Sequence, residues 1–105
     1  MGIQMKQHIA VALIALATTS AWANADLAKK NNCLACHAAD KKIVGPAYQD
    51  VAKKYAGQAD AEATVIKNIK AGGSGKWGPI PMPPQPQLSD ADAKALAVWV
   101  LGGAK

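Results

Sequence analysis

The chain has 105 residues, a length that accommodates one domain and excludes a multidomain architecture. Its twelve basic residues, all lysine, outnumber seven acidic ones and give a formal net charge of +5. Such a modestly basic surface suits acidic protein partners or an anionic membrane surface, although many lysines simply keep a protein soluble.

The N-terminal residues have the pattern of a secretory signal peptide. A lysine-bearing lead precedes a nine-residue apolar run at 9–17, and an A-x-A pattern of small residues ends at Ala23. Nine apolar residues are too few for a membrane anchor, because a hydrocarbon core needs about twenty. We expect residues 1–23 to be a signal peptide, cleaved after Ala23 or after Ala25. Residues 24–105 then form one exported domain, which in a bacterium lies in the periplasm.

The 82 residues that remain are poorly equipped to build a core. Seventeen are alanine and none is phenylalanine, and alanine buries little apolar area. Small domains of this kind usually contain disulfides, metals or cofactors. Loss of Lys6 lowers the formal net charge from +5 to +4, and His37 and Met82 become the only histidine and methionine.

Four segments predict short helices. The first, residues 25–33, is expected to run into the two cysteines, with Leu27 as its apolar anchor. The second, residues 48–57, has apolar positions at i, i+3, i+4 and i+7 and is stopped by Gly57. The third, residues 60–73, ends in a pair of glycines.

The fourth helix has the clearest boundaries. Ser89 and Asp92 form a capping-box-like start, and Gly102 with Gly103 ends the helix. No segment alternates as a strand does, so the predicted class is all-α. Long loops are expected at residues 38–47 and 73–88.

The sequence CLACH at residues 33–37 is the sharpest chemical signal. Two cysteines three positions apart, followed at once by histidine, are typical of c-type haem attachment. Within one helical turn Cys33 and Cys36 can reach both vinyl groups of a porphyrin, and His37 can bind the iron axially. A thioredoxin-like redox motif would need a βαβ setting, and structural zinc would need a fourth ligand. A plain disulfide remains an alternative.

Met82 is the candidate for the second axial position. It lies 45 residues after His37, inside the segment KWGPIPMPPQPQLS (residues 76–89), which contains five prolines. Proline stiffens a loop and removes backbone donors. The alternative is that Met82 only fills a gap, with the sixth position open or occupied by water, lysine or tyrosine. His/Met ligation would leave no position for substrate chemistry, which favours electron transfer.

Four motifs in this order resemble the small bacterial class I cytochromes c of the c-551/c-552 type. They are CLACH, VGPAYQDVAKKYAG (residues 44–57), KWGPIPMPP (76–84) and SDADAKALAVWVL (89–101). The resemblance covers all of residues 24–105. It implies an all-α class I cytochrome c fold, with about four short helices around one covalently bound haem c.

The resemblance also implies roles for individual residues. The carbonyl of Pro46 would accept a hydrogen bond from His37 Nδ1 and thereby set the imidazole tautomer. The indole N–H of Trp77 would donate to a haem propionate, although Trp77 could also be only a hydrophobic lid.

The sequence departs from the family pattern at two positions. Gln85 replaces the asparagine that many relatives have after PMPP, and Asn68 replaces a basic residue that some relatives place near a propionate.

The expected function is that of a soluble, monomeric periplasmic electron carrier, not an enzyme. Its donor would be a membrane cytochrome complex and its acceptor a periplasmic reductase or terminal oxidase, with no nucleic acid and no stable membrane insertion. Lysine pairs at 29–30, 41–42 and 53–54 could steer such partners or merely be solvated. One alternative is a haem-based ligand-binding or sensing protein with a displaceable Met82. Another is a thiol–disulfide enzyme that uses Cys33 and Cys36.

Overall fold

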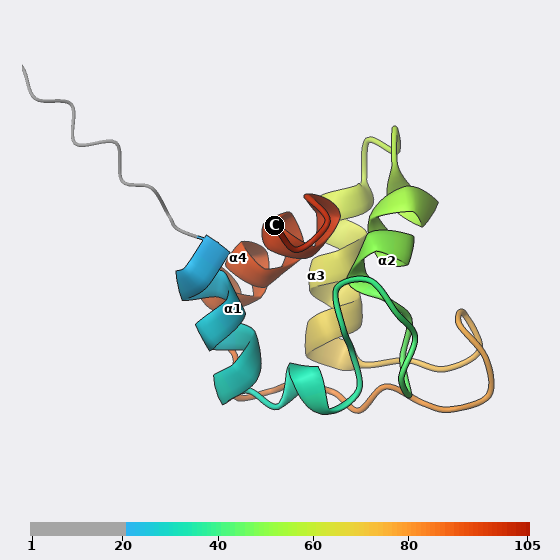
Figure 1. The fold of residues 1–105 in the computed structure, drawn as a ribbon, viewed down its shortest axis with the longest axis horizontal. Coiled ribbons are helices and arrows are strands. Elements are labelled where there is room, and N and C mark those ends of the chain that lie inside the picture. The colour runs from blue at the N-terminus through green and yellow to red at the C-terminus, as the bar shows by residue number, and fades with distance from the viewer. Residues whose placement is uncertain (1–20) are drawn as a thin grey trace, which may run out of the picture.

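The structure, a computed structural model, describes residues 21–105, and their regular structure is helical (Figure 1). The helices are α1 (Ala21–Lys30), α2 (Tyr48–Tyr55), α3 (Ala61–Ala71) and α4 (Asp90–Leu101), with one 3₁₀ turn, η1 (Cys33–Ala35). Two isolated bridges, and no strands, occur in this part of the chain. The all-α prediction is confirmed. Most of the predicted signal peptide, residues 1–20, lies outside the described residues.

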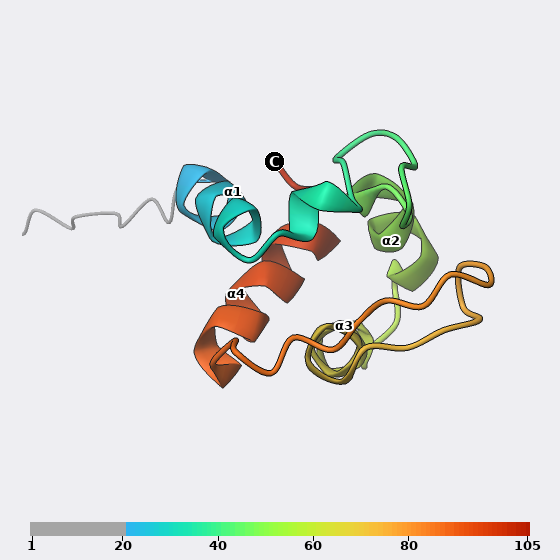
Figure 2. The ribbon, with the colours of Figure 1, turned by 90° about the horizontal axis from the view of Figure 1, so that it is seen from below.

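Helix α4 is the central element of the fold. It contacts α1, α2 and α3, and in Figure 2 it lies between α1 and α3. The helix begins as predicted, because the Asp92 amide donates to Ser89 Oγ at 3.1 Å and so satisfies an otherwise unpaired donor of the first turn. Five of its residues are buried against the other helices: Ala93, Leu96, Ala97, Trp99 and Val100.

Helix α1 differs from the prediction at its C-terminus. It ends at Lys30 and does not run into the cysteines. The side-chain amide of Asn31 donates to the Leu27 carbonyl at 2.9 Å, and Asn32 adopts the left-handed conformation with φ of 62°. Asparagine tolerates this conformation better than most residues. The cysteines consequently occupy a separate turn that can be oriented independently of α1.

The two long connections are irregular, as predicted. No helix or strand forms within residues 36–47 or 72–89, and Figure 1 shows the second connection extending well away from the helices before it returns to α4. The core between the helices is small and includes Leu88, a residue of this loop that the helical patterns did not single out. Within residues 21–105, none of the helices has the length and apolar character needed to cross a membrane.

Candidate cofactor cavity

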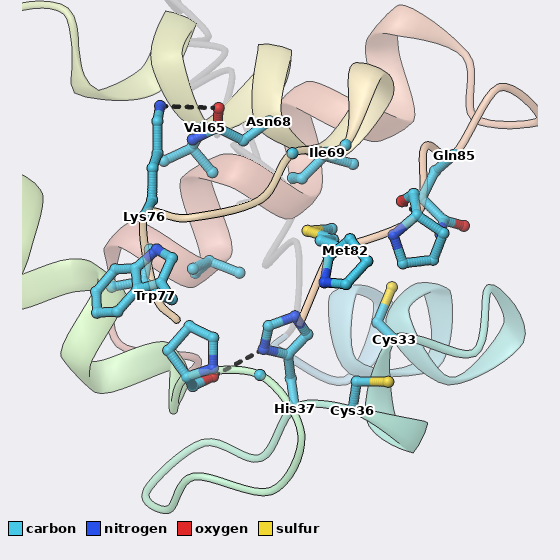
Figure 3. A pocket seen from close by; sticks show the side chains of 18 of the residues that line it. Cys33, Cys36, His37, Val65, Asn68, Ile69, Lys76, Trp77, Met82 and Gln85 are labelled. Carbon is cyan, nitrogen blue, oxygen red and sulfur yellow. Dashed lines mark hydrogen bonds between the residues drawn. The ribbon is translucent and has the colours of Figure 1, made fainter. Parts of the chain in front are cut away.

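A cavity of about 400 Å³ opens between the helices and both long loops. All six residues predicted for the site line it: Cys33, Cys36, His37, Pro46, Trp77 and Met82. Helices α2, α3 and α4 contribute apolar walls, including Val51, Val65, Ile69, Leu96 and Val100. In Figure 3 the His37 ring lies below Met82, with the cysteines on one side and Trp77, Lys76 and Asn68 on the other.

The cysteine turn is closed by its own backbone. The amides of Cys36 and His37 donate to the Cys33 carbonyl at 3.2 and 3.0 Å, which places two thiols and an imidazole on one turn. Both thiols are free and partly buried. Burial is the largest influence on Cys33 and raises the pKa of its thiol. A nucleophilic cysteine needs the opposite shift, so this environment disfavours the thiol–disulfide alternative.

The imidazole of His37 is held in a defined tautomer. Its Nδ1–H donates to the Pro46 carbonyl at 2.7 Å, a contact that the family resemblance implied. Because a carbonyl can only accept, the proton is on Nδ1 and the Nε2 lone pair is available to a metal. The ring also stacks on Tyr48, with 5.1 Å between centroids and 22° between planes.

Gly45 permits the imidazole to lie this close to the backbone. A Cβ at this position would lie 2.5 Å from His37 Cε1 and 2.9 Å from Nδ1. Real Cβ atoms do not approach other atoms so closely, so a larger residue would displace the ring and its hydrogen bond.

We expect Gly45→Ala to destabilise the haem-loaded protein by about 1–3 kcal/mol, the usual cost of overpacking a tight site. Thermal unfolding followed by visible absorption should show a midpoint at least about 4 °C lower. Gly73→Ala is the matched control, because a Cβ there would meet nothing within 4 Å. Equal midpoints for the two variants would contradict a requirement for glycine beside His37.

Met82 is attached to the end of α3 by main-chain hydrogen bonds. The Gly73 amide donates to the Met82 carbonyl at 3.1 Å, and the Met82 amide donates to the Gly73 carbonyl at 2.8 Å. Next to them, Gly72 adopts φ of 68°, and a Cβ there would lie 2.5 Å from the Met82 carbonyl oxygen. Gly72, the first of the two glycines after α3, therefore also lets the methionine segment approach the helix.

The neighbouring Gln85 has a structural role in the same segment. Its amide donates to the carbonyls of Ile69 and Lys70, both at 3.2 Å, which satisfies acceptors at the C-terminus of α3. Its side chain donates to the Pro83 carbonyl at 3.3 Å and accepts from Gln87 Nε2 at 2.6 Å. These contacts belong to the loop itself, so Gln85 contributes to the shape of the loop that carries Met82.

Sequence reasoning did not identify every residue that forms the cavity. Tyr48, Gly45, Gly72 and Lys76 were not assigned to the site. Two weak signals were available: a glycine directly before Pro46, and a glycine pair that precedes Met82 in the chain. No local pattern indicated the stacking of Tyr48 on the imidazole, because this contact joins residues of different segments.

The residues present fit a flat, largely apolar cofactor such as the haem implied by CLACH. The volume lies within the range of about 300–1,000 Å³ that is usual for small-molecule sites. Two thiols and an imidazole with a free Nε2 lie on one wall, and a thioether lies on another. Amide, amine and indole groups gather at the side away from the cysteines (Figure 3).

Comparisons with known proteins point to one family. The cytochrome c family model matches residues 23–103. The chain is 60% identical to cytochrome c-552 of Nitrosomonas europaea over 77% of its own length and 79% of the relative's. It is 54% identical to cytochrome c-552 of Hydrogenobacter thermophilus over 92% and 97% of the two lengths.

Solved structures give the same picture. The crystal structure of wild-type Nitrosomonas europaea cytochrome c552 is similar with a TM-score of 0.72 and 60% identity, covering 74% of this chain and 96% of that one. The class 1 cytochrome MtoD of Sideroxydans lithotrophicus is similar with a TM-score of 0.69 and 36% identity, covering 79% and 95%. The fold and the sequence therefore point to the same group of proteins.

Proposed function

Since this chain belongs to the cytochrome c family, as a small class I member of the c-551/c-552 type that carries one covalently attached haem c, we propose that it is a soluble one-electron carrier and not an enzyme. The haem supplies a couple between Fe(III) and Fe(II). The chain supplies attachment, axial donors and a cavity that limits access of water.

The proposed attachment and axial residues all line the cavity. Cys33 and Cys36 would form the two thioether bonds, and His37 and Met82 would be the axial ligands. The bond from His37 Nδ1–H to Pro46 orients the imidazole and strengthens it as a donor. Trp77 would donate its indole N–H to a haem propionate, and it lines the side of the cavity away from the cysteines.

One observation carries the proposal, namely the paired main-chain hydrogen bonds between Gly73 and Met82. These bonds limit how far the thioether can move within the cavity, which His37 also lines. A sixth donor held by the backbone leaves no open position for a substrate, whereas electron transfer requires none. The prolines around Met82 add stiffness to the same segment.

The location and partners of the carrier are part of the proposal. An export signal at residues 1–23, cleaved after Ala23 or Ala25, would place a monomeric domain in the periplasm of a bacterium. Its donor would be a membrane cytochrome complex, and its acceptor would be a periplasmic reductase or terminal oxidase. The lysine pairs would favour encounter with acidic partners, since redox complexes are usually small and weak.

Absorption spectra of the purified protein in both redox states test this function. We expect a low-spin haem spectrum that changes reversibly on reduction, and a weak far-red band of iron–methionine bonding in the ferric form. A high-spin ferric spectrum without this band would contradict His/Met ligation. Haem removable by acid–acetone extraction would contradict attachment through Cys33 and Cys36.

A further inference from the structure

A connected group of polar side chains forms the side of the cavity farthest from the cysteines (Figure 3). Lys76 Nζ donates to Asn68 Oδ1 at 3.3 Å, and Asn68 Nδ2 donates to the Tyr55 hydroxyl at 3.4 Å. The three residues come from the methionine loop, α3 and α2, and all line the cavity. Tyr55 is buried, with 6% of its surface exposed, so the chain of contacts runs from solvent into the core.

A second lysine, Lys54, stabilises the same region although it does not line the cavity. Lys54 Nζ lies 4.4 Å from the centre of the Trp77 ring, a cation–π geometry, and it donates to the Lys76 carbonyl at 3.4 Å. Lys54 thus holds the backbone from which Lys76 projects. The side chain of Lys76 remains directed to Asn68 at the cavity wall (Figure 3).

The charge of the cavity wall is entirely positive among the described residues. Its lining includes Lys67 and Lys76 but neither an aspartate nor a glutamate. A cation at the edge of a largely apolar cavity, with an amide and a hydroxyl beside it, is suited to a carboxylate that must lose part of its hydration. The ligand chemistry expected on this side of the cavity is therefore that of a carboxylate.

The proposed cofactor has carboxylates on the edge opposite its vinyl groups. If the vinyl edge is attached at Cys33 and Cys36, the carboxylate edge faces the side formed by Lys76, Asn68 and Tyr55. This step rests on the proposed function. Asn68 itself has no charge, so a cation for a carboxylate here must come from another position.

We propose that Lys76 is the cationic partner of a haem carboxylate, and that Asn68 is a positioning residue that holds the ammonium group at the cavity edge. A fixed positive charge favours the ferrous state, which has one positive charge fewer than the ferric state. Lys76 therefore raises the reduction potential of the protein. Asn68 acts by keeping the flexible lysine side chain close to the cofactor.

The test is the reduction potential of haem-loaded variants, measured by spectroelectrochemical titration. Lys76→Met keeps most of the aliphatic chain and removes the charge. We expect the equilibrium between ferric and ferrous protein to shift about threefold toward ferric, or about 28 mV at 59 mV per tenfold change for one electron. Lys76→Gln should give the same shift. Lys53→Met is the matched control, since Lys53 does not line this cavity, and it should shift the equilibrium much less.

A double-mutant cycle tests the role of Asn68. In an Asn68→Ala background, Lys76→Met should have less than half of its effect, because the lysine is no longer held at the cavity. Combining Lys76→Met with Asn68→Lys should restore the potential by returning a cation to the same wall. An undiminished effect in the Asn68→Ala background would overturn the positioning role.

Two other results would overturn the proposal as a whole. In one, Lys76→Met and Lys53→Met shift the potential equally, as expected for general surface charge. In the other, Lys67→Met produces the shift and Lys76→Met does not. The far-red band of the ferric form is recorded for every variant. If the proposed function itself is wrong, the wild-type protein lacks this band, which distinguishes that failure from the two results above.

Discussion

Replacing Met82 by alanine should abolish the far-red band of the ferric protein and lower its reduction potential by on the order of 100 mV or more, a fraction of the roughly 0.8 V over which axial ligands tune haem. Small external ligands should then bind both oxidation states, because alanine has no side-chain donor to replace the thioether. Potentiometric titration and ligand-binding spectra measure both effects.

Gln85→Ala is the matched control for this experiment. Gln85 lies in the same loop and lines the same cavity, but its side chain is bonded to Pro83 and Gln87. The far-red band should persist in this variant. If Met82→Ala keeps the band, the band does not arise from Met82, and the assignment of Met82 as the sixth ligand is wrong. If instead the variant keeps the protein's physiological activity and only binds small ligands more tightly, the ligand-sensing alternative is favoured.

Without haem the domain should be largely unfolded. The cavity of about 400 Å³, left without a cofactor, would cost up to about 10 kcal/mol at roughly 24 cal/mol per Å³. That cost is comparable with the whole stability of a typical domain, about 5–15 kcal/mol. The surrounding helices cannot close the gap easily, because many residues in the hydrophobic core are alanines or line the cavity itself.

Far-ultraviolet circular dichroism of a Cys33→Ala/Cys36→Ala protein produced without haem measures this effect. We expect low helicity and no cooperative thermal transition. The wild-type chain produced without haem, with reduced thiols, is the control and should be equally unfolded, since the missing cofactor and not the substitutions causes the loss. Native-like helicity in either protein would show that the polypeptide core suffices.

The local features of the fold were predictable because each depends on neighbouring residues. Ser89 begins α4 through a bond to an amide three positions later. The glycine pair at 72–73 ends α3, and the proline-rich segment forms no regular structure. Prediction was wrong at the end of α1, where a left-handed Asn32 stops the helix before the cysteines. Helical periodicity alone does not reveal such a stop.

The chemistry proposed for the site can be predicted from residue types and their spacing alone. Within residues 24–105, the only histidine is in CLACH and the only methionine is in a stiff loop. The possible axial donors are therefore restricted to very few side chains. Residue type and spacing suffice for such an inference, because the chemistry of thiols, imidazole and thioether does not depend on the fold. The same reasoning also indicated that so alanine-rich a chain needs a cofactor.

How those groups are held depends on tertiary contacts. The stacking of Tyr48 on His37, the pairing of Gly73 with Met82, and the bond from Lys76 to Asn68 each join residues that are separated by several others in the sequence. Such contacts depend on how α2, α3 and the two loops pack around one cavity. Local propensities act over a few residues, so they carry no information on which distant segments meet. Gln85 illustrates the difference, because its role as a partner for the end of α3 became evident only in three dimensions.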